Sequence, residues 1–248
     1  MDPMMYEVNW TLEDRHWWFR GRRKIFVDVL TRCLPPAAAG REPVIAELGC
    51  GTGGNLSALA HLGHVVGVEP DPVGAEWARR KTGIEIVVDK LPDCPNLPMA
   101  AFDAVGMFDV LEHIEDDRAA LCRVRDLLRP GGVALLSVPA FPWLWTRHDE
   151  SLHHVRRYTR KALVAAVREA GLTLRFARYF NFWLFLPVAA VRLFHRATGG
   201  GPPHDFSLPP GPVNAALTWL FESESDRLSR GKGYPWGVSL LALISRDT

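Results

Sequence analysis

The sequence predicts an α/β fold in which helices cover both faces of a doubly wound, mostly parallel β-sheet. From residue 44 onward, short apolar segments that suit buried strands alternate with segments of helical spacing. The first apolar segment runs directly into the glycine-rich turn GCGTGG at 49–54, as the first strand of such sheets does. The chain has 248 residues, 48% of them hydrophobic, so it can bury one large core. We therefore expect a single domain.

Seven strands and four helices follow from this pattern. The strands are expected at 44–48, 65–69, 84–88, 102–108, 133–138, 172–179 and 237–245. The helices are expected at 54–62, 72–81, 116–128 and 160–171. Pro130 and Gly131 should end the third helix and begin a turn, and Thr159 suits the N-cap of the fourth.

Two further parts should flank the doubly wound core. The core is expected at 43–180 and 236–248, with an N-terminal helical cover at 1–42 and a helical insertion at 181–235. The insertion should contain an apolar run at 180–194, a Gly/Pro-rich loop at 199–212 and a second helix at 213–228. An insertion of this length often serves as a lid or substrate wall. The apolar run is shorter than the roughly 20 residues that span a bilayer, so we expect peripheral membrane contact at most.

Composition narrows the classes of partner and compartment. The formal net charge is +1 and the two signs are mixed along the chain, which argues against nucleic acid. Cys33, Cys50, Cys94 and Cys122 form no CxxC pair, and the N-terminus lacks a basic-then-apolar signal segment. We therefore expect a cytoplasmic protein without disulfides and without a metal site.

Carboxylates lie at or directly after the ends of four successive strands of the predicted sheet. They are Glu47, Glu69, Asp89 and Asp109. In an open parallel sheet, ligands bind beyond the carboxyl ends of the strands, where these side chains should gather. Such a group repels a pyrophosphate and favours a positively charged occupant. Strand-end capping is the alternative for Asp89 and Asp109, but Glu47 lies inside an apolar strand, where an unpaired carboxylate is costly.

The glycine-rich turn at 49–54 has two interpretations. It satisfies the dinucleotide fingerprint GxGxxG, with Glu69 at a suitable distance for a ribose, so an NAD-dependent oxidoreductase is one alternative. A non-catalytic binding module that keeps the fold is another. Glu47 disfavours the dinucleotide, whereas S-adenosylmethionine carries an ammonium, a sulfonium and a ribose diol, which suit the carboxylates.

The motifs ELGCGTG, VVGVEPD, VVDKLP and FDAVGMFDVLEHIED resemble those of the Rossmann-fold class I S-adenosylmethionine-dependent methyltransferases, especially the type-11 small-molecule group, over 44–139. The resemblance implies a final strand antiparallel to its neighbour. It also implies cofactor contacts from Glu47, Gly49, Cys50, Gly51, Gly53, Asn55, Glu69, Pro70, Asp89, Lys90, Leu91, Phe108, Asp109, Val110 and His113. In that reading Glu47 anchors the methionine end and Glu69 binds the ribose hydroxyls.

The segment 145–159, WTRHDESLHHVRRYT, follows the fifth strand and resembles a subgroup of these enzymes. We expect His154 or His148 as general base, Arg157 as partner of a substrate carboxylate or phosphate, and Tyr158 in the pocket wall. Substrate contacts are expected from Trp145, His153 and Arg156. The alternative is that the arginines are solvated or pair with Asp149 and Glu150, and that the histidines are surface residues.

The segment 14–26, DRHWWFRGRRKIF, also resembles this subgroup and should lie over the cofactor. Trp17, Trp18 and Phe19 would form the cover, and Arg20 or Arg22 could reach the methionine carboxylate. The alternative is an ordinary amphipathic helix with a solvated basic face.

The expected acceptor is a small molecule, anionic or lipid-linked, methylated on oxygen or nitrogen. MFDVLEH replaces the Asn/Asp-Pro-Pro-aromatic pattern with which the amino-methylating DNA and RNA enzymes hold a base, so nucleic acid is not expected. The chain is expected to be a monomer or a homodimer.

Overall fold

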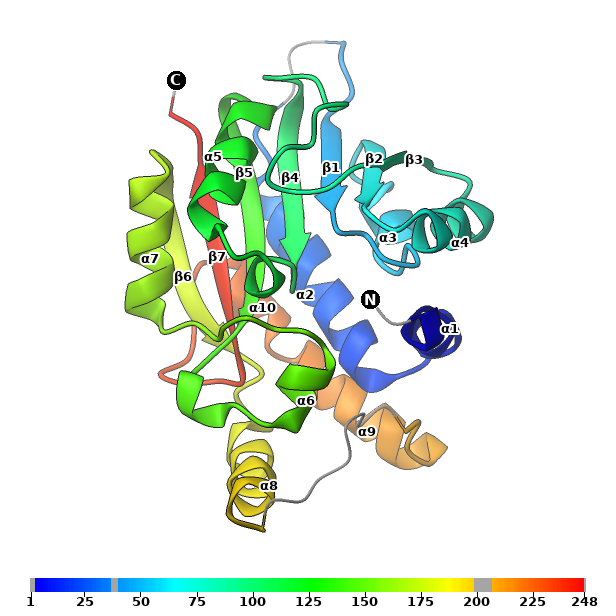
Figure 1. Cartoon of the computed structure of the whole chain (residues 1–248), viewed down its shortest axis with the longest axis vertical. Coiled ribbons are helices and arrows are strands. Elements are labelled where there is room, and N and C mark those ends of the chain that lie inside the picture. The colour runs from blue at the N-terminus through cyan, green and yellow to red at the C-terminus, as the bar shows by residue number, and fades with distance from the viewer. Residues whose placement is uncertain (1–2, 37–39, 199–206, 248) are drawn as a thin grey trace.

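The computed structural model describes residues 3–36, 40–198 and 207–247. Its centre is a seven-stranded sheet with the strand order β3-β2-β1-β4-β5-β7-β6 (Figure 1). The strands are β1 Val44–Leu48, β2 His64–Glu69, β3 Glu85–Val88, β4 Phe102–Phe108, β5 Leu128–Pro139, β6 Thr173–Phe180 and β7 Ser239–Ser245. The helices are α1 Pro3–Leu12, α2 Trp17–Cys33, α3 Leu56–Leu59, α4 Pro72–Thr82, α5 Asp117–Leu127, α6 Arg147–Ser151, α7 Arg160–Glu169, α8 Phe185–Thr198, α9 Gly211–Glu222 and α10 Ser225–Ser229. All seven predicted strands are present.

The first five strands are parallel, and β7 inserts antiparallel between β5 and β6. This arrangement confirms the doubly wound fold and the antiparallel final strand. The strand order reverses between β1 and β4, because β2 and β3 extend the sheet on one side of β1 and the later strands extend it on the other. Ligands of open α/β sheets bind outside the carboxyl ends of the strands at such a reversal.

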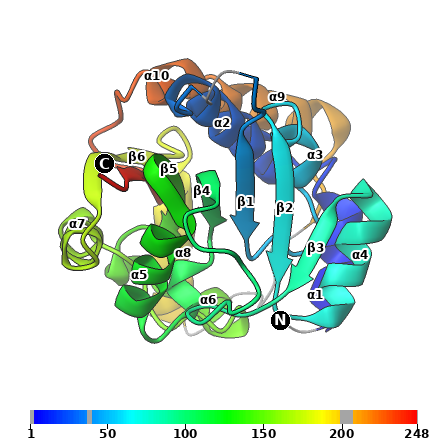
Figure 2. The ribbon, with the colours of Figure 1, turned by 90° about the horizontal axis from the view of Figure 1, so that it is seen from above.

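Two apolar layers pack against the sheet, one on each face (Figure 2). The layer formed with α5 and α7 includes Leu121 and Leu163, and the layer formed with α2, α3, α4 and α9 includes Phe26 and Phe221. Successive residues of β1 belong to opposite layers, with Ala46 in the first and Ile45 in the second. This period of two explains why a parallel strand buried on both faces reads as a continuous apolar run.

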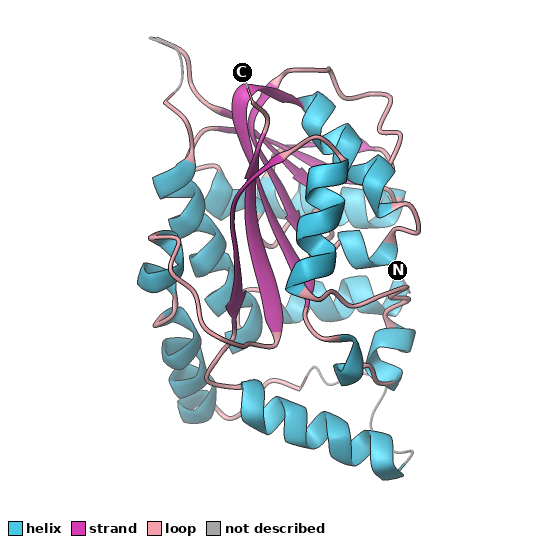
Figure 3. Ribbon diagram, turned by 90° about the vertical axis from the view of Figure 1, so that its left-hand side faces the viewer, coloured by secondary structure: helices cyan, strands magenta, loops and turns pink. Residues whose placement is uncertain are grey.

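The N-terminal helices and the insertion both pack onto this scaffold. α2 lies along α9, and a Cβ at Gly21 would lie 2.7 Å from the ring of Phe221, so the two helices approach too closely for a larger residue. α1 lies beside α4, where the rings of Trp10 and Trp77 meet edge to face at 5.0 Å. α8 extends below the carboxyl ends of the strands (Figure 3). Among the described residues, no helix combines the length and apolar character needed to cross a membrane.

Several element boundaries differ from expectation. The helix expected at 54–62 is only the single turn α3, and β5 already begins at Leu128, with a register shift across the glycines. The helix expected at 213–228 is divided into α9 and α10. The division occurs at Glu224, whose carboxylate accepts hydrogen bonds from the backbone N–H groups of Asn181 and Phe182 at 2.8 Å each. Most of the expected loop at 199–212 lies outside the described residues.

Candidate functional site

A cavity of about 1160 Å³ opens where the strand order reverses. One set of lining residues comes from the turns after β1, β2 and β3 and from α1, and it includes Glu47 and Glu69. A second set comes from the α6 region and α8, and it includes His154 and Val188. The volume exceeds the roughly 300–1,000 Å³ of ordinary ligand pockets. Two molecules, a cofactor and an acceptor, can therefore be accommodated together.

The glycine-rich turn brings backbone to the cavity wall. Gly49 and Gly51 both have left-handed backbone conformations, with φ of 73° and 56°. A Cβ at Gly49 would lie 2.5 Å from a side-chain carbon of Val110, so glycine is required there both by conformation and by space. The N–H of Gly51 donates a hydrogen bond of 2.9 Å to the carboxylate of Glu69. The turn after β1 and the end of β2 are thereby locked together.

Glu47 presents a buried carboxylate with one oxygen unsatisfied. Its Oε1 accepts a 2.8 Å hydrogen bond from Asn55 Nδ2. Its Oε2 is buried and has no hydrogen-bond partner among the described residues. Burial raises the pKa of Glu47 to about 8. A cationic group in the cavity would both satisfy this oxygen and favour the ionised carboxylate.

Glu69 is also buried, but both of its oxygens have partners. Tyr6 donates from its hydroxyl at 3.0 Å and Asp71 from its N–H at 3.2 Å, in addition to Gly51. Burial raises its pKa, an effect that these three hydrogen bonds oppose. The Tyr6 contact comes from α1, which sequence reasoning did not connect with this site. A ribose diol at Glu69 would have to share the carboxylate with Tyr6.

Arg22 supplies the positive charge at Asp109 from within the chain. Its guanidinium forms an ion pair with Asp109 and donates a 2.9 Å hydrogen bond to Ser137 Oγ. It also lies over the rings of Trp18 and Phe26, at 5.2 Å from each centroid. The expectation that Asp109 attracts a cationic ligand is therefore corrected: α2, packed along the sheet, already neutralises it.

A further buried carboxylate, Glu13, lines the cavity and was missed. It accepts hydrogen bonds from Thr52 Oγ1 at 2.8 Å and from Lys81 Nζ at 2.7 Å. Glu13 belongs to the turn between α1 and α2, and no spacing in the sequence relates it to the glycine-rich turn. The signal that could have identified Glu13 is the position of an acidic residue just before the aromatic segment 16–19.

The second half of the cavity is organised around Asp149, which is fully buried. Its carboxylate contacts His154 Nδ1 at 3.0 Å, Arg157 Nε at 2.7 Å and Arg192 Nη1 at 3.0 Å. Burial alone would raise the pKa of Asp149, but His154 and the two arginines hold it below its usual value. Asp149 is therefore a stable anion that fixes the orientation of the His154 ring. The sequence signal for this role is weak, because in the sequence Asp149 looks like a surface partner of nearby arginines.

Most of the site residues expected from the sequence line the cavity. They are Trp18, Arg22, Glu47, Gly49, Cys50, Gly51, Asn55, Glu69, Pro70, Asp89, Lys90, Leu91, Phe108, Asp109, Val110, His113, His148, His153, His154 and Arg157. Trp17 and Phe19 line it as well. The guanidinium of Arg157 is nevertheless committed to Asp149 and to the carbonyl of Ala140, so the expected pairing with a substrate anion is not supported.

Five expected residues lie outside the cavity lining: Arg20, Gly53, Trp145, Arg156 and Tyr158. Arg20 is exposed and borders a separate depression. Tyr158 is buried in the core, where its hydroxyl donates to Asp117 at 2.7 Å, and Arg156 pairs with the same carboxylate at 3.0 Å. These two side chains attach the segment to α5 instead of contacting a substrate. Gly53 packs against α4.

Comparison with known proteins agrees with this geometry. The sequence model of a methyltransferase domain family matches residues 18–175. A protein of Mycolicibacterium smegmatis named probable S-adenosylmethionine-dependent methyltransferase is 30% identical over 164 residues, covering 64% of this chain and 61% of the relative. A ubiquinone biosynthesis O-methyltransferase of Xanthomonas axonopodis is 28% identical over 160 residues, covering 57% of this chain and 65% of the relative. The matches thus span less than two thirds of these relatives.

Solved structures share the fold. The phosphoethanolamine N-methyltransferase 2 of Haemonchus contortus, in complex with S-adenosyl-L-methionine, superposes with a TM-score of 0.58 at 15% identity, covering 89% of this chain and 51% of that one. A methyltransferase of Mesorhizobium loti gives 0.56 at 16% identity, covering 85% and 94%. Family match, sheet topology and the carboxylate-lined glycine turn agree, and the chain belongs to the class I S-adenosylmethionine-dependent methyltransferase family.

Proposed function

We propose that the chain transfers a methyl group from S-adenosylmethionine to a small-molecule acceptor. The observation that carries this proposal is the buried, unsatisfied Oε2 of Glu47 beside the glycine-rich turn. The cofactor's ammonium would satisfy this oxygen, whereas a pyrophosphate would add negative charge next to it. The family membership reported above supports the same cofactor over the dinucleotide alternative.

The fit extends along the cavity wall. Glu69 and Asp89 lie at the ends of β2 and β3, where the ribose and the adenine would be held. Trp18 and Phe108 add apolar surface to the wall. When bound, S-adenosylmethionine supplies a methyl group on a positively charged sulfur, and the reaction leaves S-adenosylhomocysteine and the methylated acceptor.

We place the acceptor in the half of the cavity formed by the α6 region and α8. Leu184, Val188 and Val191 give this half an apolar wall. His154 lines it as well, and Asp149 fixes its Nδ1 side at 3.0 Å. An acceptor hydroxyl or protonated amine must lose a proton, and His154 Nε2 can take it up. These features favour an apolar acceptor methylated on oxygen or nitrogen, as the name of the Xanthomonas relative suggests for oxygen.

The outer surface of the insertion is consistent with a lipid-linked acceptor. Leu186 and Phe194 of α8 and Trp219 of α9 are exposed by 70%, 65% and 71%. Exposed apolar side chains of this size can contact a lipid or another apolar partner. An apolar, lipid-linked acceptor would then approach the cavity along α8. An anionic acceptor has less support, because Arg156 and Arg157 are already paired with carboxylates of the chain.

Calorimetry with the purified chain tests the cofactor. We expect binding of S-adenosylmethionine and S-adenosylhomocysteine and no competition by NAD. Tight binding of NAD without binding of either adenosyl compound would overturn the proposal. For the acceptor step, turnover on a panel of phenols and amines, which must lose a proton, should fall about 10²–10⁴-fold in His154→Ala. His61→Ala is the matched control, because this exposed histidine lies outside the cavity lining.

A further inference from the structure

Glu112 is fully buried, yet neither of its carboxylate oxygens has a hydrogen-bond partner among the described residues. It lies in the 3₁₀ turn Leu111–His113, directly after β4, and lines the cavity. A carboxylate removed from water without a partner is strongly unfavourable. Asp109, which lines the same cavity, and Asp149, which contacts the same His154, each have an arginine partner. Among the described residues, Glu112 therefore has no hydrogen-bonding partner that compensates its burial.

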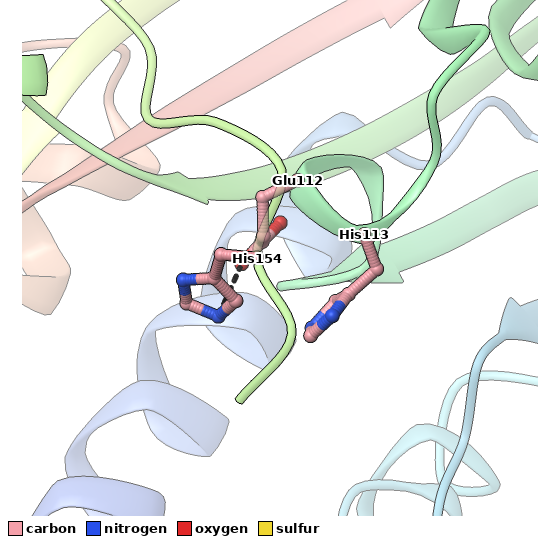
Figure 4. A group of neighbouring side chains, drawn as sticks. All are labelled: Glu112, His113 and His154. Atoms are coloured by element: carbon pink, nitrogen blue, oxygen red, sulfur yellow. Dashed lines mark ion pairs between the residues drawn. The ribbon is translucent and has the colours of Figure 1, made fainter. Parts of the chain in front are cut away.

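Two histidines surround this carboxylate (Figure 4). His154 Nε2 lies 4.0 Å from Glu112 Oε1. The rings of His113 and His154 meet edge to face, with centroids 4.8 Å apart. One nitrogen of each ring and one oxygen of Glu112 all lie within 4.8 Å of one another. Three side chains that commonly bind metal ions thus converge on one point of the cavity wall.

Asp149 prepares His154 for this role. Because its carboxylate contacts Nδ1 at 3.0 Å, the proton belongs on Nδ1, which leaves Nε2, 4.0 Å from Glu112 Oε1, free to bind a metal ion. A carboxylate behind a ligating imidazole is the usual way in which proteins fix the tautomer and orientation of a metal ligand. Arg157 and Arg192 hold Asp149 in place in turn.

We propose that Glu112, His113 and His154 bind a divalent transition-metal ion in the acceptor half of the cavity. Two imidazoles and one carboxylate suit zinc or a similar first-row ion and not magnesium or calcium, which prefer oxygen ligands. Bonds of about 2.0–2.2 Å place ligand atoms roughly 3–3.5 Å apart, so the three side chains must close by about 1 Å when the ion binds. This site replaces the expectation of no metal.

Three protein ligands leave a coordination position directed into the cavity. If the proposed methyltransferase function holds, an acceptor oxygen would occupy that position. A bound metal ion lowers the pKa of a coordinated hydroxyl, so the acceptor could lose its proton to solvent without a free imidazole. In the metal-loaded protein His154 is then a ligand, and in the metal-free protein it is the proton acceptor. His113 separates these two roles, since it would serve only the metal.

Metal binding can be tested without activity. The chain, free of any histidine tag and stripped with a chelator, would be titrated with Zn²⁺ by calorimetry, and Co²⁺ would be followed by its visible absorption. We expect one ion per chain. His113→Ala and Glu112→Gln should each weaken binding at least 100-fold. Asp149→Asn removes the carboxylate behind His154 without replacing a metal ligand, and should weaken binding about 10–100-fold. His61→Ala, at an exposed histidine outside the cavity lining, is the matched control and should bind as the parent does.

Several results would overturn the site. These are no stoichiometric Zn²⁺ binding, or undiminished binding in either His113→Ala or Glu112→Gln. Circular dichroism and S-adenosylhomocysteine affinity verify that each variant is folded. If Zn²⁺ fails to bind while S-adenosylmethionine binds and methyl transfer proceeds, only the metal inference is wrong. If Zn²⁺ binds but S-adenosylmethionine does not, the proposed function is wrong and the metal site stands.

Discussion

Replacing Glu47 by glutamine should affect cofactor affinity and protein stability in opposite directions. The carboxylate is buried, accepts from Asn55 through Oε1 and has no partner at Oε2. Glutamine keeps the oxygen for Asn55 and places an NH₂ group where the proposed ammonium would bind. A charge-assisted hydrogen bond contributes about 1.5–3 kcal/mol, so Glu47→Gln should weaken S-adenosylhomocysteine binding about 10–150-fold.

Stability should increase in Glu47→Gln, because burial destabilises the ionised carboxylate when no ligand is bound. Burial raises the pKa of Glu47 from its ordinary value of 4.5 to about 8. Between these values the folded protein binds more protons at this site than the unfolded chain does, so the contribution of Glu47 to stability falls as the pH rises. The loss is about 1.4 kcal/mol per pH unit. Glu47→Gln lacks this loss and should become progressively more stable than the parent from pH 5 to pH 8.

Two measurements check this reasoning. Chemical denaturation at several pH values gives the stability difference, and calorimetry in two buffers of different ionisation enthalpy counts protons. The parent should release close to one proton from this site when ligand binds at pH 7, and the variant none. Glu76→Gln, at a half-exposed carboxylate on α4, is the control. An unchanged affinity in Glu47→Gln, or an unchanged dependence of stability on pH, would refute the account of this residue.

Three further changes test the scaffold. Arg22→Met should lower the free energy of unfolding by about 2–4 kcal/mol in denaturation experiments. The loss should be smaller than for a fully buried pair, because the side chain of Asp109 is 27% exposed. Adding Asp109→Asn should recover part of the lost stability. Gly49→Ala should cost more stability and more cofactor affinity than Gly51→Ala, because both have positive φ but only at Gly49 does the new Cβ meet a side chain, at 2.5 Å. Glu224→Ala should lower the thermal midpoint, since two backbone amides lose the acceptor that lies 2.8 Å from each.

The fold could be predicted from the sequence because each of its signals is local. Apolar runs such as those of β1 and β4 are long enough to mark strands buried on both faces, and the glycines after β1 mark the tight turn. Boundaries were less predictable where a distant group determines them. The division between α9 and α10 depends on Glu224 reaching the backbone after β6, a contact between residues 42 or 43 positions apart.

The site could be predicted only where a strand position carried the information. Glu47 was identified because a carboxylate inside an apolar strand needs a partner, and its Oε2 has no hydrogen-bond partner in the part of the chain that the structure describes. Tyr6 and Glu13 could not be found in this way, because they reach the cavity through the packing of α1 and α2. Arg156 and Tyr158 were placed in the site because their segment is rich in functional side chains, yet both are used to attach that segment to Asp117.

The distribution of charge compensation indicates what the cavity binds. The chain neutralises Asp109 with Arg22, Asp149 with Arg157 and Arg192, and Glu13 with Lys81. Among the buried carboxylates of the described residues, only Glu47 and Glu112 have oxygens without a hydrogen-bond partner.

Because an uncompensated buried charge is costly, these two positions are where ligand charge can be stabilised most. Glu47 lies in the half that we assign to the cofactor and Glu112 in the half that we assign to the acceptor. Two cations, one organic and one metallic, should therefore stabilise the chain independently. Thermal shifts produced by S-adenosylhomocysteine and by Zn²⁺ should be close to additive in the parent, whereas Glu47→Gln should diminish only the first and Glu112→Gln only the second. A loss of both shifts in either variant would show that the two carboxylates belong to one site.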